Sequence, residues 1–487
     1  MFKNCHFLLI AFFFVSNVYV LKAQLHGNNL FEYQYGKIPT DTEKFNSAYD
    51  RLFLSYDYKN FKSFATLEQY YTPYSERNYT QATQYGITYN SKFLDIKAGT
   101  FQETLGRGLL LRSFEIPGAI LEDISYRSRY YFQRDILGGS AYFKLKKFNA
   151  KVLYGKPLNN VFPPSQPNST RRSEEIYAGQ LEYNFKGQSF AVATMQVNGS
   201  EKDTYGMAYF SGNILEGLNY YGEFAKAISD NQTSDWSFDS SQALYLNLNY
   251  FKNNFGITTE YKYYNKFVLG SGLNEPPALI KQHVYRTLNR STHVPQPFNE
   301  SGTQIEAVYN FKDGSVLTFN NAFSNNDFGI KYLFQEYFLE YVKPIGNKWY
   351  LKSFADFAQD PFKLEKDRIS FGLYSEYLFS DKFTFNFDTE AQFFKREENK
   401  VVNTVFNIGV TYKNKLIINL LTEFSTDPVF TTDLRSWLGA TTKYQFKEKQ
   451  YVQIFAGQRR GGPACNAGIC YEILDFQGFE VRYVARF

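Results

Sequence analysis

FTFNFDTEAQF, at positions 383–393, places apolar and polar side chains on opposite faces of an extended chain. Phe383, Phe385, Phe387, Ala391 and Phe393 share one face, and Thr384, Asn386, Asp388, Glu390 and Gln392 share the other. This period of two predicts a β-strand with one apolar face and one face in contact with water.

The same pattern repeats along almost the whole chain, with short polar turns between the strands. It predicts eleven hairpins, near residues 48–71, 81–101, 138–157, 174–197, 202–228, 241–265, 302–323, 333–358, 368–394, 402–425 and 433–459. Single strands near 28–36 and 472–487 bring the total to about 24, within a range of 20 to 26. We therefore expect an all-β fold, a large antiparallel transmembrane β-barrel with short periplasmic turns and longer outer loops.

The composition agrees with a barrel wall that alternates between lipid and lumen. The mean hydropathy is −0.42, yet the chain holds 50 Phe and 41 Tyr. After residue 21, no apolar run approaches the ~20 residues of a membrane helix. A formal net charge of +5 without any Lys/Arg block gives no reason to expect nucleic-acid binding. We find no cofactor motif and no metal-binding spacing of Cys and His, so no cofactor is predicted.

Residues 1–23 have the features of a removed signal peptide, with Lys3, an apolar stretch at 7–21 and Ala23 before the cut. The alternative is a membrane anchor, but the apolar stretch is short for one. Residues 24–487 would then form a single barrel domain, and its two cysteines, Cys465 and Cys470, are predicted to form a disulfide that closes a loop tip.

Many predicted short turns follow an aromatic residue and a lysine, as in Phe311-Lys312-Asp313-Gly314. Aromatic residues at one height on the apolar face predict an interfacial girdle. The simpler alternative is that Phe and Tyr favour strands. In the last strand, QGFEVRYVARF, the residues Phe479, Val481, Tyr483 and Phe487 share one face. A terminal Phe on such a strand resembles the signal that the barrel-assembly machinery of outer membranes reads during insertion.

Charged residues on the polar faces must line a lumen, because a Lys or Arg facing lipid at mid-height costs about 2–4 kcal/mol. Asp388, Glu390 and Arg435 are such wall residues. Residues 102–137 interrupt the strand pattern and carry five arginines: Arg107, Arg112, Arg127, Arg129 and Arg134. Two hypotheses remain open: an arginine-rich constriction that selects anions, or two more wall strands with the arginines in the lumen.

Residues 267–301 also interrupt the pattern. Four prolines there exclude a regular central strand: Pro276, Pro277, Pro295 and Pro297. The segment is expected to fold into the lumen as a plug or to cap the outer mouth. Its candidate functional residues are Glu275, His283, Arg290 and His293. The spacing of His and Glu matches no standard metal site, so ordinary loop packing is the preferred interpretation.

Three stretches together, GRGLLLRSFE, NEPPALI with the following LNR..H, and RGG..C....C, resemble an uncharacterised family of outer-membrane proteins from Bacteroidota and related phyla. The resemblance covers about residues 25–487. It implies an outer-membrane barrel of a Gram-negative bacterium, and it implies neither a substrate nor catalytic residues.

The leading functional hypothesis is a pore or transporter for a polar solute. The alternative is a non-conducting barrel that scaffolds a secretion or surface-protein assembly complex. An enzyme is not expected, because only His283 and His293 could join a catalytic arrangement, and both lie in one irregular loop. The predicted partners are outer-membrane lipid, lipopolysaccharide, the barrel-assembly machinery and other outer-membrane proteins.

Overall fold

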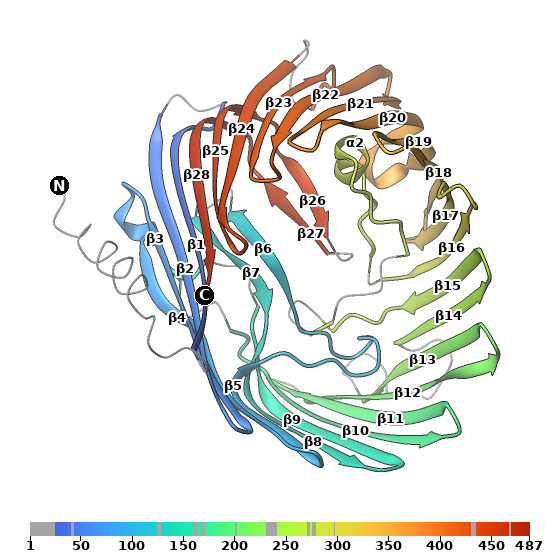
Figure 1. The fold of residues 1–487 in the computed structure, drawn as a ribbon. Helices are drawn as coiled ribbons and strands as arrows, with labels where there is room; N and C mark the ends of the chain where they lie inside the picture. The colour runs from blue at the N-terminus through green and yellow to red at the C-terminus, as the bar shows by residue number, and fades with distance from the viewer. Residues whose placement is uncertain are drawn as a thin grey trace.

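The structure is a computed structural model that describes residues 25–39, 43–123, 128–159, 163–166, 171–199, 202–229, 241–269, 273–274, 279–296, 298–429, 435–466 and 469–487. These residues form a closed antiparallel barrel of 24 strands (Figure 1). Each wall strand pairs with its neighbours in chain order, and the first strand pairs with the last, which closes the ring.

The first half of the wall runs from β1 to β15. Its strands are β1 (Leu25–Lys37), β2 (Phe45–Tyr58), β3 (Phe61–Tyr71), β4 (Tyr79–Asn90), β5 (Leu94–Phe101), β8 (Ile136–Leu145), β9 (Phe148–Pro157), β10 (Glu175–Phe185), β11 (Gln188–Asn198), β12 (Lys202–Leu215), β13 (Leu218–Ser229), β14 (Gln242–Lys252) and β15 (Phe255–Asn265).

The second half continues with β16 (Glu300–Asn310), β17 (Val316–Asp327), β18 (Lys331–Ile345), β19 (Trp349–Asp360), β20 (Glu365–Ser380), β21 (Phe383–Arg396), β22 (Asn399–Tyr412), β23 (Leu416–Ser425), β24 (Arg435–Lys447), β25 (Gln450–Arg459) and β28 (Phe476–Arg486). The remaining elements belong to the connections: β6 (Phe114–Asp123), β7 (Ser128–Arg134), β26 (Gly462–Asn466), β27 (Ile469–Ile473), the helix α2 (Arg286–Arg290) and the short 3-10 helices η1 (Ser75–Arg77) and η3 (Pro361–Lys363).

The predicted fold class and the strand number are confirmed, and every predicted hairpin is present. One of the two hypotheses for residues 102–137 is wrong, because that segment adds no wall strands. Phe101 at the end of β5 pairs directly with Ile136 at the start of β8, so the wall closes without the segment. β6 and β7 pair with each other in a separate sheet.

The alternation of residues in β21 agrees with its sequence pattern. Phe385 and Phe387 are 46% and 42% exposed on the outside of the barrel, whereas Glu390 and Gln392 are 2% and 1% exposed. Large apolar side chains are exposed on strand after strand, which makes an apolar exterior. Among the residues that the structure describes, no helix has the length and apolarity to cross a membrane.

Eleven short turns lie at one end of the barrel, together with both ends of the described chain. Several use residues with positive φ, such as Lys186 with Gly187 and Lys413 with Asn414, which tight two-residue hairpin turns require. At the same end, the backbones of Gly27 and Phe487 exchange two hydrogen bonds of 2.8 and 3.0 Å. All longer connections therefore leave from the opposite end.

Two rows of glycines cross the wall in direct register. One row joins Gly86, Gly99, Gly138 and Gly155 on β4, β5, β8 and β9. The other joins Gly439, Gly457, Gly478 and Gly36 on β24, β25, β28 and β1. A Cβ at Gly138 would lie 2.0 Å from the carbonyl oxygen of Tyr154, so the backbones approach too closely for any side chain. Such glycines allow a sheet to bend sharply, and only β2 and β3 separate the two bends.

Candidate functional site: the lumen and its inner segments

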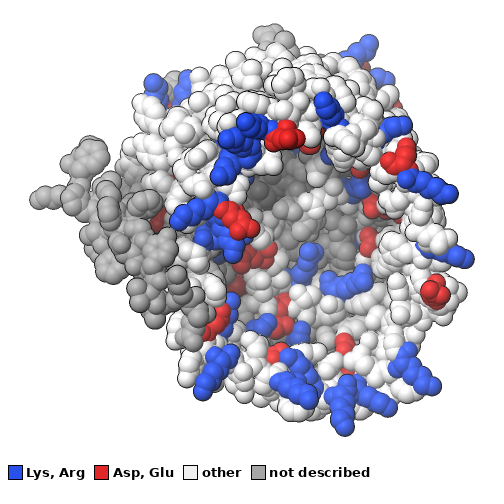
Figure 2. Space-filling view, viewed as in Figure 1, with Lys and Arg blue, Asp and Glu red and all other residues white. Residues whose placement is uncertain are grey.

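Three connections from the long-loop end fold back inside the ring of strands (Figure 1). The first contains the inner loop, residues 102–113, and the inner hairpin, β6–β7. The second contains the helical segment, residues 279–296, which includes α2. The third contains the terminal hairpin, β26–β27. Figure 2 shows side chains of both charge signs around the central hollow of the barrel.

The inner loop extends the hydrophobic core into the lumen. Leu105, Leu109, Leu110 and Leu111 are fully buried. They belong to one cluster with apolar residues that point inward from β8 to β15, among them Leu153, Ile176, Met195, Met207, Tyr221 and Tyr245. Burying four leucines removes a large apolar area from water, at about 25 cal/mol per Å². This part of the lumen is therefore filled by tight apolar packing.

A wall carboxylate, Glu223 on β13, fixes the turn of the inner loop. Its two oxygens accept hydrogen bonds from the backbone N–H groups of Arg107 (2.7 Å) and Leu109 (3.2 Å). Gly106 has a φ of +54°, and a Cβ there would lie 2.7 Å from the carboxylate of Glu223. Glycine is thus required at this position both by the backbone conformation and by the close approach of the wall.

The inner hairpin packs against the flat part of the wall between the two glycine rows. Ile120 and Tyr130 join a buried cluster with Tyr49, Tyr70 and Tyr79 of β2, β3 and β4. The carboxylate of Glu68 on β3 accepts hydrogen bonds from the hydroxyls of Tyr49 and Tyr79 and from the backbone N–H of Tyr131. A buried carboxylate with three donors holds the hairpin to the wall.

Buried ion pairs connect the inner hairpin to the seam where the barrel closes. Arg129 on β7 contacts Glu32 on β1 at 2.7 Å and Glu122 on β6 at 3.1 Å. Glu32 also pairs with Arg482 on β28. Burial alone would lower the pKa of Arg129, but the two carboxylates raise it above its ordinary value, so the side chain stays charged.

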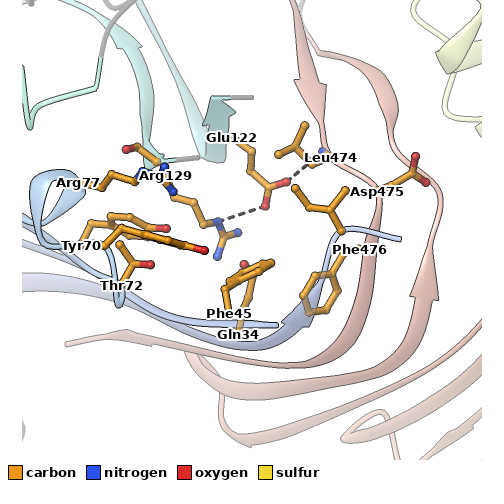
Figure 3. Close-up of a pocket in the computed structure, with 13 residues that line it drawn as sticks. Gln34, Phe45, Tyr70, Thr72, Arg77, Glu122, Arg129, Leu474, Asp475 and Phe476 are labelled. Carbon is orange, nitrogen blue, oxygen red and sulfur yellow. Dashed lines mark hydrogen bonds and ion pairs between the residues drawn. The ribbon is translucent and has the colours of Figure 1, made fainter. Parts of the chain in front are cut away.

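The pocket in Figure 3 lies at the long-loop end of this seam. Glu122 accepts a hydrogen bond of 3.0 Å from the backbone N–H of Leu474 and pairs with Arg129. Phe45, Tyr70 and Phe476 line the pocket, whose volume is only ≈ 40 Å³. That space is far below the ~300 Å³ of small-molecule sites, so the pocket is a packing gap between hairpin and wall.

The helical segment is tied to carboxylates that point inward from the wall. Glu390 on β21 accepts hydrogen bonds from the backbone N–H groups of Arg286 (2.9 Å) and Thr287 (2.8 Å) and from the hydroxyl of Thr287. Lys281 pairs with Glu306 at 2.6 Å, and the hydroxyl of Tyr285 donates to Glu340. The start of the segment is therefore held by three separate strands.

Its remaining part is held in the same way. Arg290 makes a two-pronged contact with Glu423 on β23, at 2.6 and 3.2 Å. His293 lies 2.9 Å from Asp360 and stacks on Phe334. His283 lies 3.2 Å from Glu336, which also pairs with the fully buried Arg368. Removing one partner of such a pair would leave an uncompensated buried charge.

The helical segment contacts the start of the terminal hairpin. Arg290 donates to the backbone oxygen of Arg460 at 3.4 Å, directly before β26. Burial and the nearby Arg290 lower the pKa of Arg460 to about 10. A polar cavity of ≈ 420 Å³ remains between α2, the inner faces of β20 to β22 and residues 460–462.

The structure disperses the arginines of residues 102–137 instead of gathering them. Arg107 is exposed in the lumen and lies over the ring of Tyr221 at 4.2 Å. Arg112 is half-buried, and burial lowers its pKa. Arg134 lies over Phe114, and burial lowers its pKa to about 10. The charge of Arg129 is balanced by its ion pairs with Glu32 and Glu122, and Arg127 lies outside the described residues.

The other predicted site residues are distributed around the barrel. Asp388 accepts a hydrogen bond of 2.7 Å from Asn407, and Arg435 lies over the ring of Trp437. Phe479 and Phe487 are exposed on the outside, and Val481 and Tyr483 lie between them on β28. Glu275 lies outside the described residues, so the predicted loop cluster is described only for His283, Arg290 and His293.

The backbones of Cys465 and Cys470 lie directly opposite each other in the β26–β27 hairpin. Their side chains lie outside the described part of the chain, so the disulfide stays a prediction. Within the described ranges, no group of three or more His, Cys, Asp and Glu residues is arranged to hold a metal ion.

Six further wall residues that hold the inner segments were not among the predicted site residues: Glu32, Glu68, Glu223, Glu336, Glu423 and Arg368. Each is a charged residue on the polar face of a predicted strand, and each is at most 3% exposed. The sequence does indicate that these charged residues lie within strands and face the lumen, and this could have marked them as candidates. Their partners are far away in the sequence, so no local spacing connects them.

Comparison with solved structures supports the fold. The P pilus usher PapC translocation pore aligns with a TM-score of 0.53 and 8% identity, over 95% of this chain and 99% of that chain. PapC in the E. coli P pilus tip assembly intermediate PapC–PapD–PapK–PapG aligns with a TM-score of 0.55 and 8% identity, over 95% of this chain and 60% of that chain. At this identity the likeness concerns the fold alone.

No curated protein sequence matches the chain. A family model matches residues 213–487, which is more than half of the sequence. On that match, the chain belongs to a family of unknown function, DUF6029.

Proposed function

We propose that the protein is an outer-membrane channel of a Gram-negative bacterium that passes a polar solute, with the helical segment as a displaceable gate. The apolar exterior and the polar lumen of the 24-stranded barrel support an outer-membrane location. The short turns would face the periplasm, and lipid, lipopolysaccharide and the barrel-assembly machinery would be its partners. An origin in Bacteroidota belongs to the same proposal and rests on the sequence resemblance alone.

The main support for the gate is that the inner loop and the helical segment are held to the wall by different sets of contacts. The inner loop keeps four fully buried leucines in an apolar core that continues into the wall. The helical segment also buries apolar side chains, Leu279, Tyr285 and Leu288. In addition, it contacts a series of wall carboxylates: Glu306, Glu336, Glu340, Asp360, Glu365, Glu390 and Glu423.

This difference matters because water or a solute can replace a lost polar contact, whereas nothing replaces lost apolar packing. A carboxylate that loses a protein donor can take one from water or from a solute, so the net free energy of each hydrogen bond is small. Leucines that leave the core gain no replacement contacts. The helical segment is therefore the part of the lumen that can move while the barrel stays intact.

Single-channel conductance in a planar bilayer tests the proposal. We would compare the full chain, a variant in which a short Gly-Ser linker replaces residues 279–296, and Glu423→Gln, which weakens the contact of Arg290. Glu103→Gln is the matched control, because Glu103 pairs with Lys97 and Lys151 beside the inner loop. We expect small or intermittent current in the full chain, steady current without the segment, more frequent opening in Glu423→Gln and no change in Glu103→Gln.

A non-conducting scaffold is the second candidate function. It is favoured by the contacts among the inner segments, since Leu474 beside β27 bonds to Glu122 of the inner hairpin and Arg290 of α2 reaches Arg460. These contacts join the inner segments to one another inside the barrel. Absence of current in the full chain and in the variant without residues 279–296 would exclude the channel and favour the scaffold.

A further inference from the structure

The polar cavity beside α2 lies where three parts of the molecule meet. The helical segment contributes Arg286 and Asn289, the wall contributes Tyr374, Asp388 and Asn407, and the start of the terminal hairpin contributes Arg460. Its volume of ≈ 420 Å³ falls in the ~300–1,000 Å³ range of small-molecule sites. The other cavity described above, at the seam, is about a tenth of this size.

Charges of both signs lie around this cavity. Three guanidiniums meet three carboxylates there: Arg286, Arg290 and Arg460 with Asp388, Glu390 and Glu423. Arg290 and Glu423 bind each other closely, and Glu390 receives four donors from α2 and Tyr374. A further cation, Lys352 on β19, lies 5.0 Å from the centre of the Tyr374 ring. Neither sign is in large excess, so the lining suits a ligand whose groups both donate and accept hydrogen bonds.

Two charged groups in the lining retain capacity for a ligand. The side chain of Arg286 is 50% exposed, and its nearest carboxylate oxygen, on Glu423, is 3.9 Å away, beyond hydrogen-bond distance. Asp388 is half-buried and accepts one bond, from Asn407. The cavity therefore offers a cationic donor and an anionic acceptor together, with two amides and an aromatic ring.

We propose that this cavity binds a small neutral saccharide and that the saccharide is the solute, or part of the solute, of the proposed channel. A hydroxyl is both a donor and an acceptor, so neighbouring hydroxyls of one sugar can bond to Arg286 and Asp388 at the same time. The ring of Tyr374 supplies an apolar contact for the carbon face of the sugar. The inference rests on the proposed function, and it adds the chemical class of the ligand.

The position of the cavity couples binding to the gate. A saccharide there would contact the helical segment through Arg286, the wall through Asp388 and the terminal hairpin through Arg460. By linkage, a ligand that binds this three-part site stabilises the arrangement in which α2 contacts the wall. Saccharide binding would therefore hold the segment in place while the sugar is bound.

Binding to the purified full chain tests the site. Calorimetric titrations with maltose, glucuronate and glucosamine compare a neutral, an anionic and a cationic sugar. Arg286→Gln and Asp388→Asn remove one charge each without removing much volume. Arg107→Gln is the matched control, because Arg107 is also an exposed arginine on an inner segment and does not line this cavity.

We expect saturable binding of maltose, weakened on the order of tenfold to hundredfold by Arg286→Gln and by Asp388→Asn, and unchanged by Arg107→Gln. Three results would overturn the inference: no saturable binding of maltose, equal weakening in all three variants, or tighter binding of either charged sugar than of maltose.

Conductance separates this inference from the channel itself. If the full chain conducts but binds no maltose, the saccharide site is refuted and the proposed channel is not. If maltose binds with the expected pattern but neither the full chain nor the variant without residues 279–296 conducts, the proposed channel is refuted and the saccharide site is not.

Discussion

Glu32 on the first wall strand and Arg129 on the inner hairpin form a buried ion pair of 2.7 Å. Glu32 is fully buried and also binds Arg482 on the last strand. One carboxylate thus joins both edges of the closing seam and the hairpin that lies inside it.

Replacing Glu32 by Gln should strongly destabilise the barrel. The buried Arg129 and the partly exposed Arg482 would lose their shared carboxylate, and breaking a buried pair costs about 3–5 kcal/mol. The free energy of unfolding in urea, measured in lipid vesicles, checks this. Asp57→Asn is the control, because Asp57 pairs with His26 at an exposed site and should matter little. Equal stability of Glu32→Gln and the parent would contradict a structural role for the pair.

Gly138→Ala should impair folding, whereas Gly179→Ala should not. A Cβ at Gly138 would meet the carbonyl oxygen of Tyr154 at 2.0 Å, while one at Gly179 would find its nearest atom at 3.8 Å. Neither glycine has a positive φ, so only the steric contact differs. The heat-dependent shift of the folded barrel on an SDS gel measures the folded fraction. Similar folded fractions in both variants would argue against a tight bend at Gly138.

Glu223→Gln should loosen the inner loop and leave the barrel wall folded. The substitution removes the charge that strengthens the hydrogen bonds from Arg107 and Leu109, and bonds to a charged group contribute about 1.5–3 kcal/mol. Hydrogen exchange should become faster at residues 105–111 and stay unchanged in β16 to β23. Unchanged exchange in the loop would show that its leucines hold it alone.

Phe487→Ala should lower the amount of folded protein in the outer membrane. Phe487 closes the seam through two backbone bonds to Gly27, and its ring packs over that glycine. Phe446→Ala is the matched control, since Phe446 is a similarly exposed aromatic residue beside another short turn. Membrane fractionation with immunodetection compares them. Equal outer-membrane levels of the two variants would refute a special role of Phe487 in insertion.

The wall could be predicted because its information is local. The alternation in residues such as Phe385, Asp388 and Glu390 fixes which face each strand turns to the lumen, and residues such as Gly187 and Asn414 mark the turns. The number of strands follows from counting hairpins. None of this requires knowledge of contacts that are distant in the sequence.

The lumen could not be predicted in the same way, because its contacts join distant residues. The sequence shows that residues 102–137 are rich in arginine, but it does not show that Glu32 neutralises Arg129. Likewise His283 and His293 stand out as the histidines of one loop, while Glu336 and Asp360, which bind them, are ordinary wall residues in the sequence. Charge at one position carries no information about its partner across a ring of strands.

The glycine rows have a further consequence for the space inside the barrel. A ring of 24 strands has a fixed perimeter, but the area that it encloses depends on its shape and is largest for a circle. Only β2 and β3 lie between the two rows, and sharp bends at both rows would draw the ring away from a circle and reduce that area. A large barrel can then be filled by two short hairpins, one loop and one helical turn, so a few backbone atoms at Gly138 and Gly457 help to decide how much lumen remains for a solute.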